Sequence, residues 1–380
     1  MTVLSPRLAS LIADDVYYVR EGAQGLRRIS REVKESFRFS ETDFLEGKSG
    51  GWLFQKTTGF VLLGEGQGRY DGHKLIAVRG TASLADAITD GNVGLSTSTS
   101  GSAIHNGFNR TFESFRPSLQ SYVERAPAST TFHCVGHSLG GALAGLVADW
   151  ISHSYGRSTQ LYTFGAPRVG KANFANGTSH RVGKFFRCTH GSDPVPMVPV
   201  WPFIHAPVKG IEYRLDGAQS ISVAAHSMGE GGNPGYRNTA NHSSWEPLAD
   251  KAYDFLNQPV RLRVEDSHHA SFSTYWADRL SAAIITLLKD AGYYAAVMAQ
   301  AGMMAGFTFY DLLARTMEKI AQVGGALVEQ LKGLLGHMLA FAGKAVSLLR
   351  DLTFSFIRWV FEVTLKRLYT VAREALKSVQ

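Results

Sequence analysis

Two hydrophobic patterns follow each other along the chain, and the first indicates a layered α/β structure. Up to about Leu288, short β-branched or aromatic runs alternate with helical segments and with turns rich in Gly, Pro and Asn. That alternation is typical of a mostly parallel sheet flanked by helices. We expect strands in residues 51–64, 74–80, 130–136, 160–166, 184–190 and 210–217, and helices in residues 109–123 and 141–152.

The second pattern begins after about Ala277, where the strand signals vanish. Apolar residues recur at alternating spacings of three and four from Leu313 to Leu352, which is the heptad repeat of packed helices. We therefore predict an α/β domain in residues 1–288 and an all-α C-terminal region in residues 289–380. For this region, a helical hairpin packed on itself or on the first domain, insertion into a membrane and binding of a partner all stay open.

The excess positive charge is concentrated near the C-terminus. The chain has 39 Lys and Arg against 32 Asp and Glu, and residues 312–380 contain ten of these bases against five acids. The bases lie between Leu, Phe, Trp and Val, so we expect a surface that faces a membrane or a partner, and no nucleic acid. The uncharged run 291–310 is diluted by Ala, Gly, Gln and Thr, which favours a buried or conditionally inserted helix over a membrane-spanning one.

Composition narrows the class of protein further. With 44% hydrophobic and 19% charged residues, the chain can form a large core, which excludes a disordered protein. Cys134 and Cys188 lie in apolar runs, so we expect buried free thiols. No Cys/His set has metal-ligand spacing and no Gly-rich loop has a phosphate-binding context, so we infer no metal and no cofactor. Asp14 and Asp15 interrupt the apolar stretch near the N-terminus, so we expect no cleavable signal peptide and synthesis in the cytoplasm.

Candidate chemistry appears at Gly136-His137-Ser138-Leu139-Gly140, a G-x-S-x-G sequence. A predicted strand precedes it and a helix rich in small residues follows it, which is the context of a nucleophile elbow. A serine hydroxyl is a poor nucleophile at neutral pH, so a histidine has to accept its proton and a carboxylate has to orient that histidine. Both partners should lie downstream of Ser138.

Five blocks of sequence, taken in order, closely resemble the class 3 lipases, a family with the α/β-hydrolase fold: residues 77–90, 104–108, 135–144, 162–170 and 190–199. The resemblance implies an α/β-hydrolase-type sheet, Asp193 as the acid of a catalytic triad, and Thr81 with the N–H of Leu139 as donors to an oxyanion. Asp193 also follows the predicted strand 184–190, at the carboxyl end where such sheets place their sites. The family further implies a helical lid in residues 83–90.

Several histidines follow Asp193, and the sequence leaves the choice of the triad histidine open. His226 looks like the His-Ser-Met of bacterial family members, which precedes a tyrosine, here Tyr236. The spacing to Tyr236 is longer than the usual gap in the family. His242, His268 and His269 therefore stay as alternatives.

Three other histidines are expected to have structural places. His205 lies in a proline-rich segment only twelve residues after Asp193, and we expect it to pack beside the pocket. His105 and His137 belong to blocks of the family but precede the acid in the chain, so we expect both to be structural.

Together these residues predict a serine lipase or phospholipase, in which Ser138 attacks the ester, His226 transfers the proton and Asp193 holds the imidazole. The expected substrates are acylglycerols or membrane phospholipids, and the basic tail favours phospholipids. The alternative is a membrane-active or interaction protein whose C-terminal helices carry the activity. A resemblance to antibacterial lipase effectors of bacteria adds two expectations, export by a contact-dependent secretion system and an immunity or chaperone protein as partner.

Overall fold

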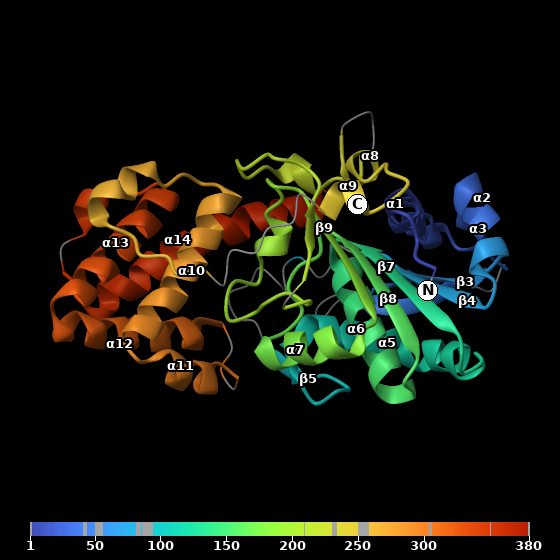
Figure 1. The fold of residues 1–380 in the computed structure, drawn as a ribbon, viewed down its shortest axis with the longest axis horizontal. Helices are drawn as coiled ribbons and strands as arrows, with labels where there is room; N and C mark the ends of the chain where they lie inside the picture. The colour runs from blue at the N-terminus through green and yellow to red at the C-terminus, as the bar shows by residue number, and fades with distance from the viewer. Residues whose placement is uncertain are drawn as a thin grey trace.

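In the computed structural model, a twisted sheet with its helices adjoins a second, helical part formed by the C-terminal third of the chain (Figure 1). The structure describes residues 2–40, 44–49, 56–80, 85, 94–208, 210–229, 234–249, 258–302, 304, 306–349 and 351–378.

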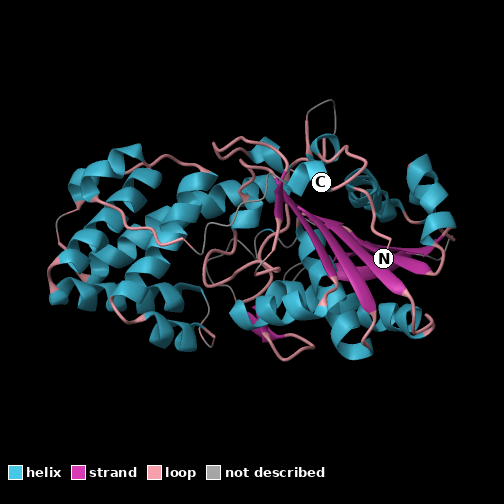
Figure 2. Ribbon diagram, in the orientation of Figure 1, coloured by secondary structure: helices cyan, strands magenta, loops and turns pink. Residues whose placement is uncertain are grey.

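The main sheet is mostly parallel, and Figure 2 shows its strands as a fan. Its order is β1-β3-β4-β7-β8-β9-β10, with β2 paired to β3, and all neighbours from β4 to β10 are parallel. The strands are β1 (Phe37–Arg38), β2 (Phe44–Ser49), β3 (Lys56–Gly66), β4 (His73–Val78), β7 (Thr131–His137), β8 (Ser158–Phe164), β9 (Lys184–Thr189) and β10 (Glu212–Arg214). A separate antiparallel pair joins β5 (Leu95–Thr97) and β6 (Ala103–His105). This is the α/β-hydrolase-type sheet that the sequence predicts.

Helices cover both faces of the sheet. On one face α6 (Leu139–Tyr155) packs against β7 and β8 and is flanked by α5 (Asn106–Glu124) and α7 (Ala172–Arg181). On the other face α1 (Pro6–Asp15) packs against β4, β7 and β8. The remaining elements of this part are η1 (Val16–Glu21), α2 (Ala23–Arg28), α3 (Arg31–Ser36), η2 (Gly68–Tyr70), η4 (Val195–Met197), η5 (Val223–His226), α8 (Tyr236–Thr239) and α9 (Glu246–Ala249). By contrast, η7 (Val264–His269) packs against α13 (Ala326–Phe341) in the helical part.

Alternation along the strands divides the buried side chains between two hydrophobic clusters. On β7, Cys134 belongs to the cluster beneath α5 and α6, whereas the adjacent Val135 belongs to the cluster beneath α1. Successive side chains of a strand point to opposite faces, so one strand contributes to both layers. Cys188 lies in the second cluster, and both cysteines are buried free thiols, as expected.

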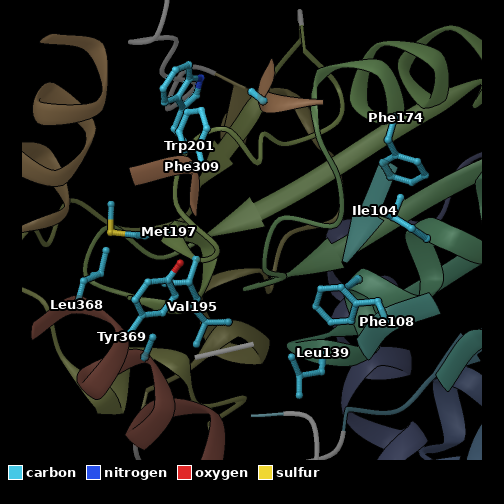
Figure 3. Close-up of a cluster of buried hydrophobic side chains, with 14 of the residues drawn as sticks. Ile104, Phe108, Leu139, Phe174, Val195, Met197, Trp201, Phe309, Leu368 and Tyr369 are labelled. Atoms are coloured by element: carbon cyan, nitrogen blue, oxygen red, sulfur yellow. The ribbon is translucent and has the colours of Figure 1, made fainter. Parts of the chain in front are cut away.

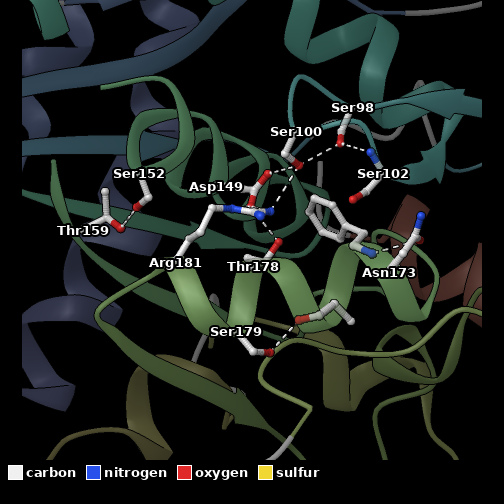
Figure 4. Close-up of polar contacts among 12 residues, drawn as sticks. Ser98, Ser100, Ser102, Asp149, Ser152, Thr159, Asn173, Thr178, Ser179 and Arg181 are labelled. Carbon is white, nitrogen blue, oxygen red and sulfur yellow. Dashed lines mark hydrogen bonds and ion pairs between the residues drawn. The ribbon is translucent and has the colours of Figure 1, made fainter. Parts of the chain in front are cut away.

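A buried polar network fixes α6, the helix that follows the predicted nucleophile. Asp149 of α6 is 1% exposed, and its Oδ1 accepts hydrogen bonds from Thr178 Oγ1 at 2.9 Å and from Arg181 Nε at 2.9 Å (Figure 4). Its Oδ2 accepts from Ser100 Oγ at 2.8 Å. A buried charge that is paired and fully bonded is tolerated, and here it ties α6 to α7 and to the β5–β6 turn.

The C-terminal helices pack mainly on one another. They are α10 (Thr274–Asp290), α11 (Tyr294–Ala301), α12 (Gly306–Val323), α13 (Ala326–Phe341) and α14 (Phe354–Lys377), with η8 (Val346–Leu348) before the last. The heptad positions Leu313, Met317, Leu331 and Leu334 are all buried. The repeat is not one helix, because the positive φ angles of Gly324 and Gly325 end α12 and start a new direction.

The predicted boundary between residues 288 and 289 falls inside a helix. α10 begins at Thr274 and packs against α13, so the helical region starts earlier than expected. One hydrophobic cluster also continues from the sheet into these helices. The division into two independently folding domains stays a prediction.

By length and hydropathy, none of the described helices could span a membrane by itself. α10 and α11 pass the same criteria only as a pair, which is bent by 120°. The uncharged run 291–310 contains α11 and the beginning of α12.

The longest C-terminal helix joins the two parts. α14 starts among the other C-terminal helices and ends beside the sheet, where it packs against η4 and η5 (Figure 1). The Tyr369 hydroxyl accepts a hydrogen bond from the backbone N–H of Val200 at 3.3 Å. Lys171 adds a second connection, because its ammonium donates to the carbonyls of Ala301 and Met304 near the end of α11.

Asp278 of α10 faces the sheet edge. Its carboxylate lies 3.6 Å from Nη2 of Arg214, which in turn lies 3.9 Å from Glu212. Burial raises the pKa of Asp278 to about 7; the charge of Glu212 adds to that rise, and Arg214, Arg168 and Arg187 oppose it. A carboxyl group with a raised pKa binds its proton more tightly in the folded state. Its contribution to stability is therefore lost as the pH rises from the ordinary aspartate range through 7.

Asp278→Asn is expected to gain stability relative to the unchanged protein as the pH rises from about 5 to about 8. At the lower pH both side chains are neutral, whereas at the higher pH only the aspartate places a charge in this buried position. Urea unfolding of both proteins at the two pH values measures the change. An equal difference in free energy of unfolding at both values would show that Asp278 does not titrate in this range.

Candidate active site

Ser138 occupies a strained turn between a strand and a helix. β7 ends at His137, α6 begins at Leu139, and Ser138 between them has φ 57° and ψ −133°. It is the one non-glycine residue with positive φ in the part of the chain that the structure describes. Such strain is characteristic of a nucleophile elbow, which holds the hydroxyl above the sheet.

The glycines on either side make this turn feasible. A Cβ atom on Gly136 would lie 2.4 Å from the backbone of Gly140, and one on Gly140 would lie 2.1 Å from the carbonyl oxygen of Val78. Both contacts are with backbone atoms and are too short for any side chain. The G-x-S-x-G pattern is therefore required here by close approach of the strand, the turn and the helix.

Ser138, His226 and Asp193 form a continuous hydrogen-bonded chain. His226 Nε2 lies 2.7 Å from Ser138 Oγ, and His226 Nδ1 lies 2.8 Å from Asp193 Oδ2. His226 ends η5, and Asp193 follows β9. The three side chains come from separate segments and meet at the carboxyl end of the parallel strands, as expected for this class of sheet.

Asp193 is held by two further donors. Tyr236 donates its hydroxyl hydrogen to Asp193 Oδ2 at 2.7 Å, and the N–H of Val195 donates to Oδ1 at 2.8 Å. The Tyr236 oxygen itself accepts from the N–H of His190 at 2.9 Å. Burial raises the pKa of Tyr236 well above its usual range, and the adjacent Asp193 charge adds to the rise, so the phenol remains a donor. Sequence analysis used Tyr236 only as a marker of spacing and missed this role.

His137 contacts the backbone of His226. Its Nε2 lies 2.9 Å from the carbonyl oxygen of His226, and its Nδ1 lies 2.9 Å from the Tyr17 hydroxyl. Nε2 must donate to the carbonyl, so Nδ1 accepts from Tyr17 in the neutral ring. Burial lowers the pKa of His137 well below its usual range, with a smaller effect from His226. The structural role expected for His137 is thus a contact with the catalytic segment.

The alternative histidines lie elsewhere. His242, His268 and His269 are exposed, and among the described histidines only His226 bonds both Ser138 and Asp193. His205 bonds the carbonyl of Pro196 at 2.7 Å and lines the pocket next to Asp193, as expected. His105 caps α5 by accepting from the N–H of Gly107, which is a structural role.

Of the two predicted oxyanion donors, only Leu139 lies among the described residues. Leu139 is the first residue of α6, so its N–H is among the amides at the start of a helix that have no acceptor within it. Thr81 lies outside the described residues, and so does the predicted lid at 83–90 apart from Ala85, which is buried. Ser138 is 3% exposed and His226 is fully buried. No cluster of three metal-ligating side chains occurs among the described residues.

Part of the chain is similar in sequence to known lipases. Residues 75–203 match the family model described as Lipase (class 3). A Fusarium solani protein named "Secreted mono- and diacylglycerol lipase 1" is 38% identical over 150 residues, covering 38% of this chain and 44% of the relative. A Gibberella zeae protein named "Secreted mono- and diacylglycerol lipase 2" is 27% identical over 242 residues, covering 51% of this chain and 57% of the relative.

Solved structures give more distant matches. The Rhizomucor miehei lipase propeptide complex has a TM-score of 0.40 and 24% identity, covering 55% of this chain and 66% of that one. The lipase of Rhizopus microsporus var. chinensis has a TM-score of 0.38 and 23% identity, covering 57% and 78%.

These matches cover only part of this chain and part of each relative. The chain spans less than two thirds of the length of these curated relatives, and both are fungal, so the bacterial type expected from the sequence finds no support. The family match does include Ser138 and Asp193. Residues 75–203 are similar to the class 3 lipase model, and this stretch carries the serine and the acid of the candidate triad.

Proposed function

We propose that this protein is a serine hydrolase that cleaves carboxylic ester bonds of lipids through an acyl-enzyme intermediate. The observation that carries the proposal is the hydrogen-bonded chain from Asp193 through His226 to Ser138, at 2.8 and 2.7 Å, on a strained elbow. Nucleophile, base and orienting carboxylate in this order are the arrangement that activates a serine hydroxyl.

Each step can be assigned to an atom. Ser138 Oγ attacks the ester carbonyl carbon while His226 Nε2 takes its proton, and Asp193 stabilises the imidazolium through Nδ1–H. The N–H of Leu139, with Thr81 as the second expected donor, stabilises the oxyanion. His226 then protonates the leaving alcohol, and an acyl-enzyme remains on Ser138. Water attacks this ester with His226 as base, which releases the carboxylic acid and restores the serine.

The substrate class is supported by two observations. The relatives named as mono- and diacylglycerol lipases support acylglycerols. The excess of bases in residues 312–380 favours anionic phospholipid surfaces as a second class, because each base near such a surface adds about 1 kcal/mol to binding. The same relatives are named as secreted, which supports export of this chain. A role as an antibacterial effector with an immunity or chaperone partner stays a prediction.

Ser138→Ala is expected to lower release of fatty acid by about a millionfold, the loss seen when the serine of a comparable triad is removed. Mass spectrometry of products from diacylglycerol emulsion and from phosphatidylglycerol vesicles measures the loss and identifies the bond cut. Ser154→Ala on the exposed face of α6 is the matched control, with normal activity expected.

Two outcomes would contradict the proposal. Fatty acid release that persists in Ser138→Ala would remove Ser138 from the mechanism. Vesicle leakage without release of fatty acid, equal in both proteins, would instead support a membrane-active protein whose C-terminal helices carry the activity.

A further inference from the structure

A cavity lined by charged side chains lies next to the triad acid. Its volume is about 100 Å³, and its lining residues come from β9, β10, α10, Arg168 and the segment between Asp193 and Gly210. A water molecule in the liquid occupies about 30 Å³, so the cavity has room for a few waters or for one small oxyanion. Ser138 is not one of the lining residues. The cavity is therefore distinct from the place where an ester meets the nucleophile.

Three guanidinium groups share this cavity, those of Arg168, Arg187 and Arg214. All three act on the carboxyl group of Asp278, because each of them opposes the rise of its pKa. The three positive charges thus lie around one point of the wall. Like charges gathered in a largely buried place are unfavourable unless negative charge accompanies them.

The carboxylates of the wall are already engaged. Glu212 Oε1 accepts a hydrogen bond from Thr189 Oγ1 at 2.6 Å, and Glu212 Oε2 lies 3.2 Å from Arg187 Nη2. Both oxygens of Asp193 accept the hydrogen bonds that hold the triad. Burial raises the pKa of Asp278 to about 7, so this carboxyl is only partly ionised at neutral pH. The wall therefore holds three positive charges against two full negative charges and one partial one.

Arg168 and Arg187 keep donors that no acceptor of the described residues uses. Arg168 is 7% exposed, and its guanidinium makes a single hydrogen bond, a long one of 3.4 Å to the carbonyl of Pro199. No described carboxylate lies within 4.0 Å of it. Arg187 Nε is buried and has no hydrogen-bond partner among the described residues. Buried charged donors without acceptors are costly, so they point to a ligand of opposite charge.

The cavity lies where the sheet part and the helical part of the molecule meet. Met197 of η4 lines it and belongs to the hydrophobic cluster that includes Leu368 and Tyr369 of α14 (Figure 3). Thr274 and Asp278 of α10 also line it. A ligand in this cavity contacts both parts of the molecule, and a ligand that binds only the folded state stabilises that state.

We propose that this cavity binds one phosphate group, held by Arg168, Arg187 and Arg214. The planar fork of a guanidinium matches two oxygens of such a group, and hydrogen bonds between charged partners are the strong ones. Two sources carry this group, inorganic phosphate and the headgroup of a phospholipid. The site lies apart from Ser138 and does not depend on the ester hydrolase function proposed above.

Titration calorimetry of the full-length protein with inorganic phosphate, at constant ionic strength, tests the proposal. We expect saturable binding of one phosphate per chain and a rise in melting temperature over the same concentrations, with no such rise in chloride. Arg168→Gln and Arg214→Gln should each weaken the binding at least about tenfold, because each removes a hydrogen bond between charged partners. Arg263→Gln is the matched control, since the Arg263 side chain is 76% exposed and does not line the cavity, and it should keep the original affinity.

Glycerol 3-phosphate separates the two sources, because it carries the headgroup phosphate without acyl chains. Binding at least as tight as that of inorganic phosphate would assign the site to a phospholipid headgroup, and weaker binding would assign it to the free anion. If neither compound binds saturably to the unchanged protein, the proposal is overturned, and this result needs no variant to fold. Binding that Arg168→Gln and Arg214→Gln both leave unchanged would overturn it as well. None of these measurements uses an ester, so failure of the hydrolase function would leave them unaffected.

Discussion

His226→Gln is expected to lower kcat for p-nitrophenyl butyrate by about a millionfold, which is as much as the loss of the nucleophile itself. The reason lies in the two contacts of the ring, at 2.7 Å to Ser138 and at 2.8 Å to Asp193. Glutamine keeps a polar side chain of similar length but cannot accept the serine proton and pass it to the leaving alcohol. Initial rates over a range of substrate concentrations measure the change, and thermal unfolding verifies the fold.

The alternative histidines provide matched controls for this variant. His242 and His268 are exposed and lie outside the hydrogen-bonded chain, so His242→Gln and His268→Gln should retain the original kcat and KM. A large loss in either control, together with activity in His226→Gln, would move the base to another histidine. Comparable losses in all three would indicate damage to the fold.

Sequence patterns mark the candidate nucleophile and the candidate acid more strongly than the candidate histidine. Ser138 is marked locally, because the turn needs Gly136 and Gly140 where backbone atoms approach within 2.4 Å of an added Cβ. Asp193 is marked by its place after a parallel strand. The only local mark of His226 is its His-Ser-Met sequence ahead of Tyr236, and the long spacing to that tyrosine left three other histidines open. Which histidine reaches Ser138 depends on how η5 folds back toward β7. Packing of η5 against α14 helps to fix that path, and no spacing in the sequence reveals it.

Most of the contacts that the sequence did not predict are hydrogen bonds between residues far apart in the chain. The bond from His137 to the His226 carbonyl joins residues 89 positions apart, and the bond from Tyr236 to Asp193 joins residues 43 apart. The family resemblance did mark Tyr236, and a buried tyrosine near a triad acid is a signal that could have suggested its role. The heptad repeat predicted packed helices correctly, but it included Gly324, which ends α12 with φ 81°.

The attachment of α14 to the sheet part was also left open by the sequence. Amphipathic helices with a basic exposed face are compatible with a membrane, a partner or the chain's own core. In the structure one face of α14 packs into the chain's own core, because Leu368 and Tyr369 are buried in the same cluster as Val195 and Met197. Three bases of this helix, Arg358, Lys366 and Lys377, are exposed, so burial of one face leaves charge available for a lipid surface.

Asp193→Asn is expected to lower kcat by about ten thousandfold, as the same change does in the serine protease triad. An asparagine amide can present its NH₂ group to His226 Nδ1, which would leave the proton on Nε2 and prevent that nitrogen from acting as the base. KM should change little, because Asp193 is buried behind the histidine and does not touch the substrate in this mechanism.

Tyr236→Phe is the comparison variant for Asp193→Asn, because it changes the surroundings of the carboxylate and keeps its charge. The phenylalanine leaves the carboxylate in place but removes one of its donors and leaves the His190 N–H without its acceptor. A buried group without a partner costs about 1–3 kcal/mol of stability, so we expect a lower melting temperature and a loss of kcat much smaller than that of Asp193→Asn. If Asp193→Asn instead kept the original rate, or fell no further than Tyr236→Phe, Asp193 would be a structural carboxylate, and the charge that supports His226 would have to come from another residue.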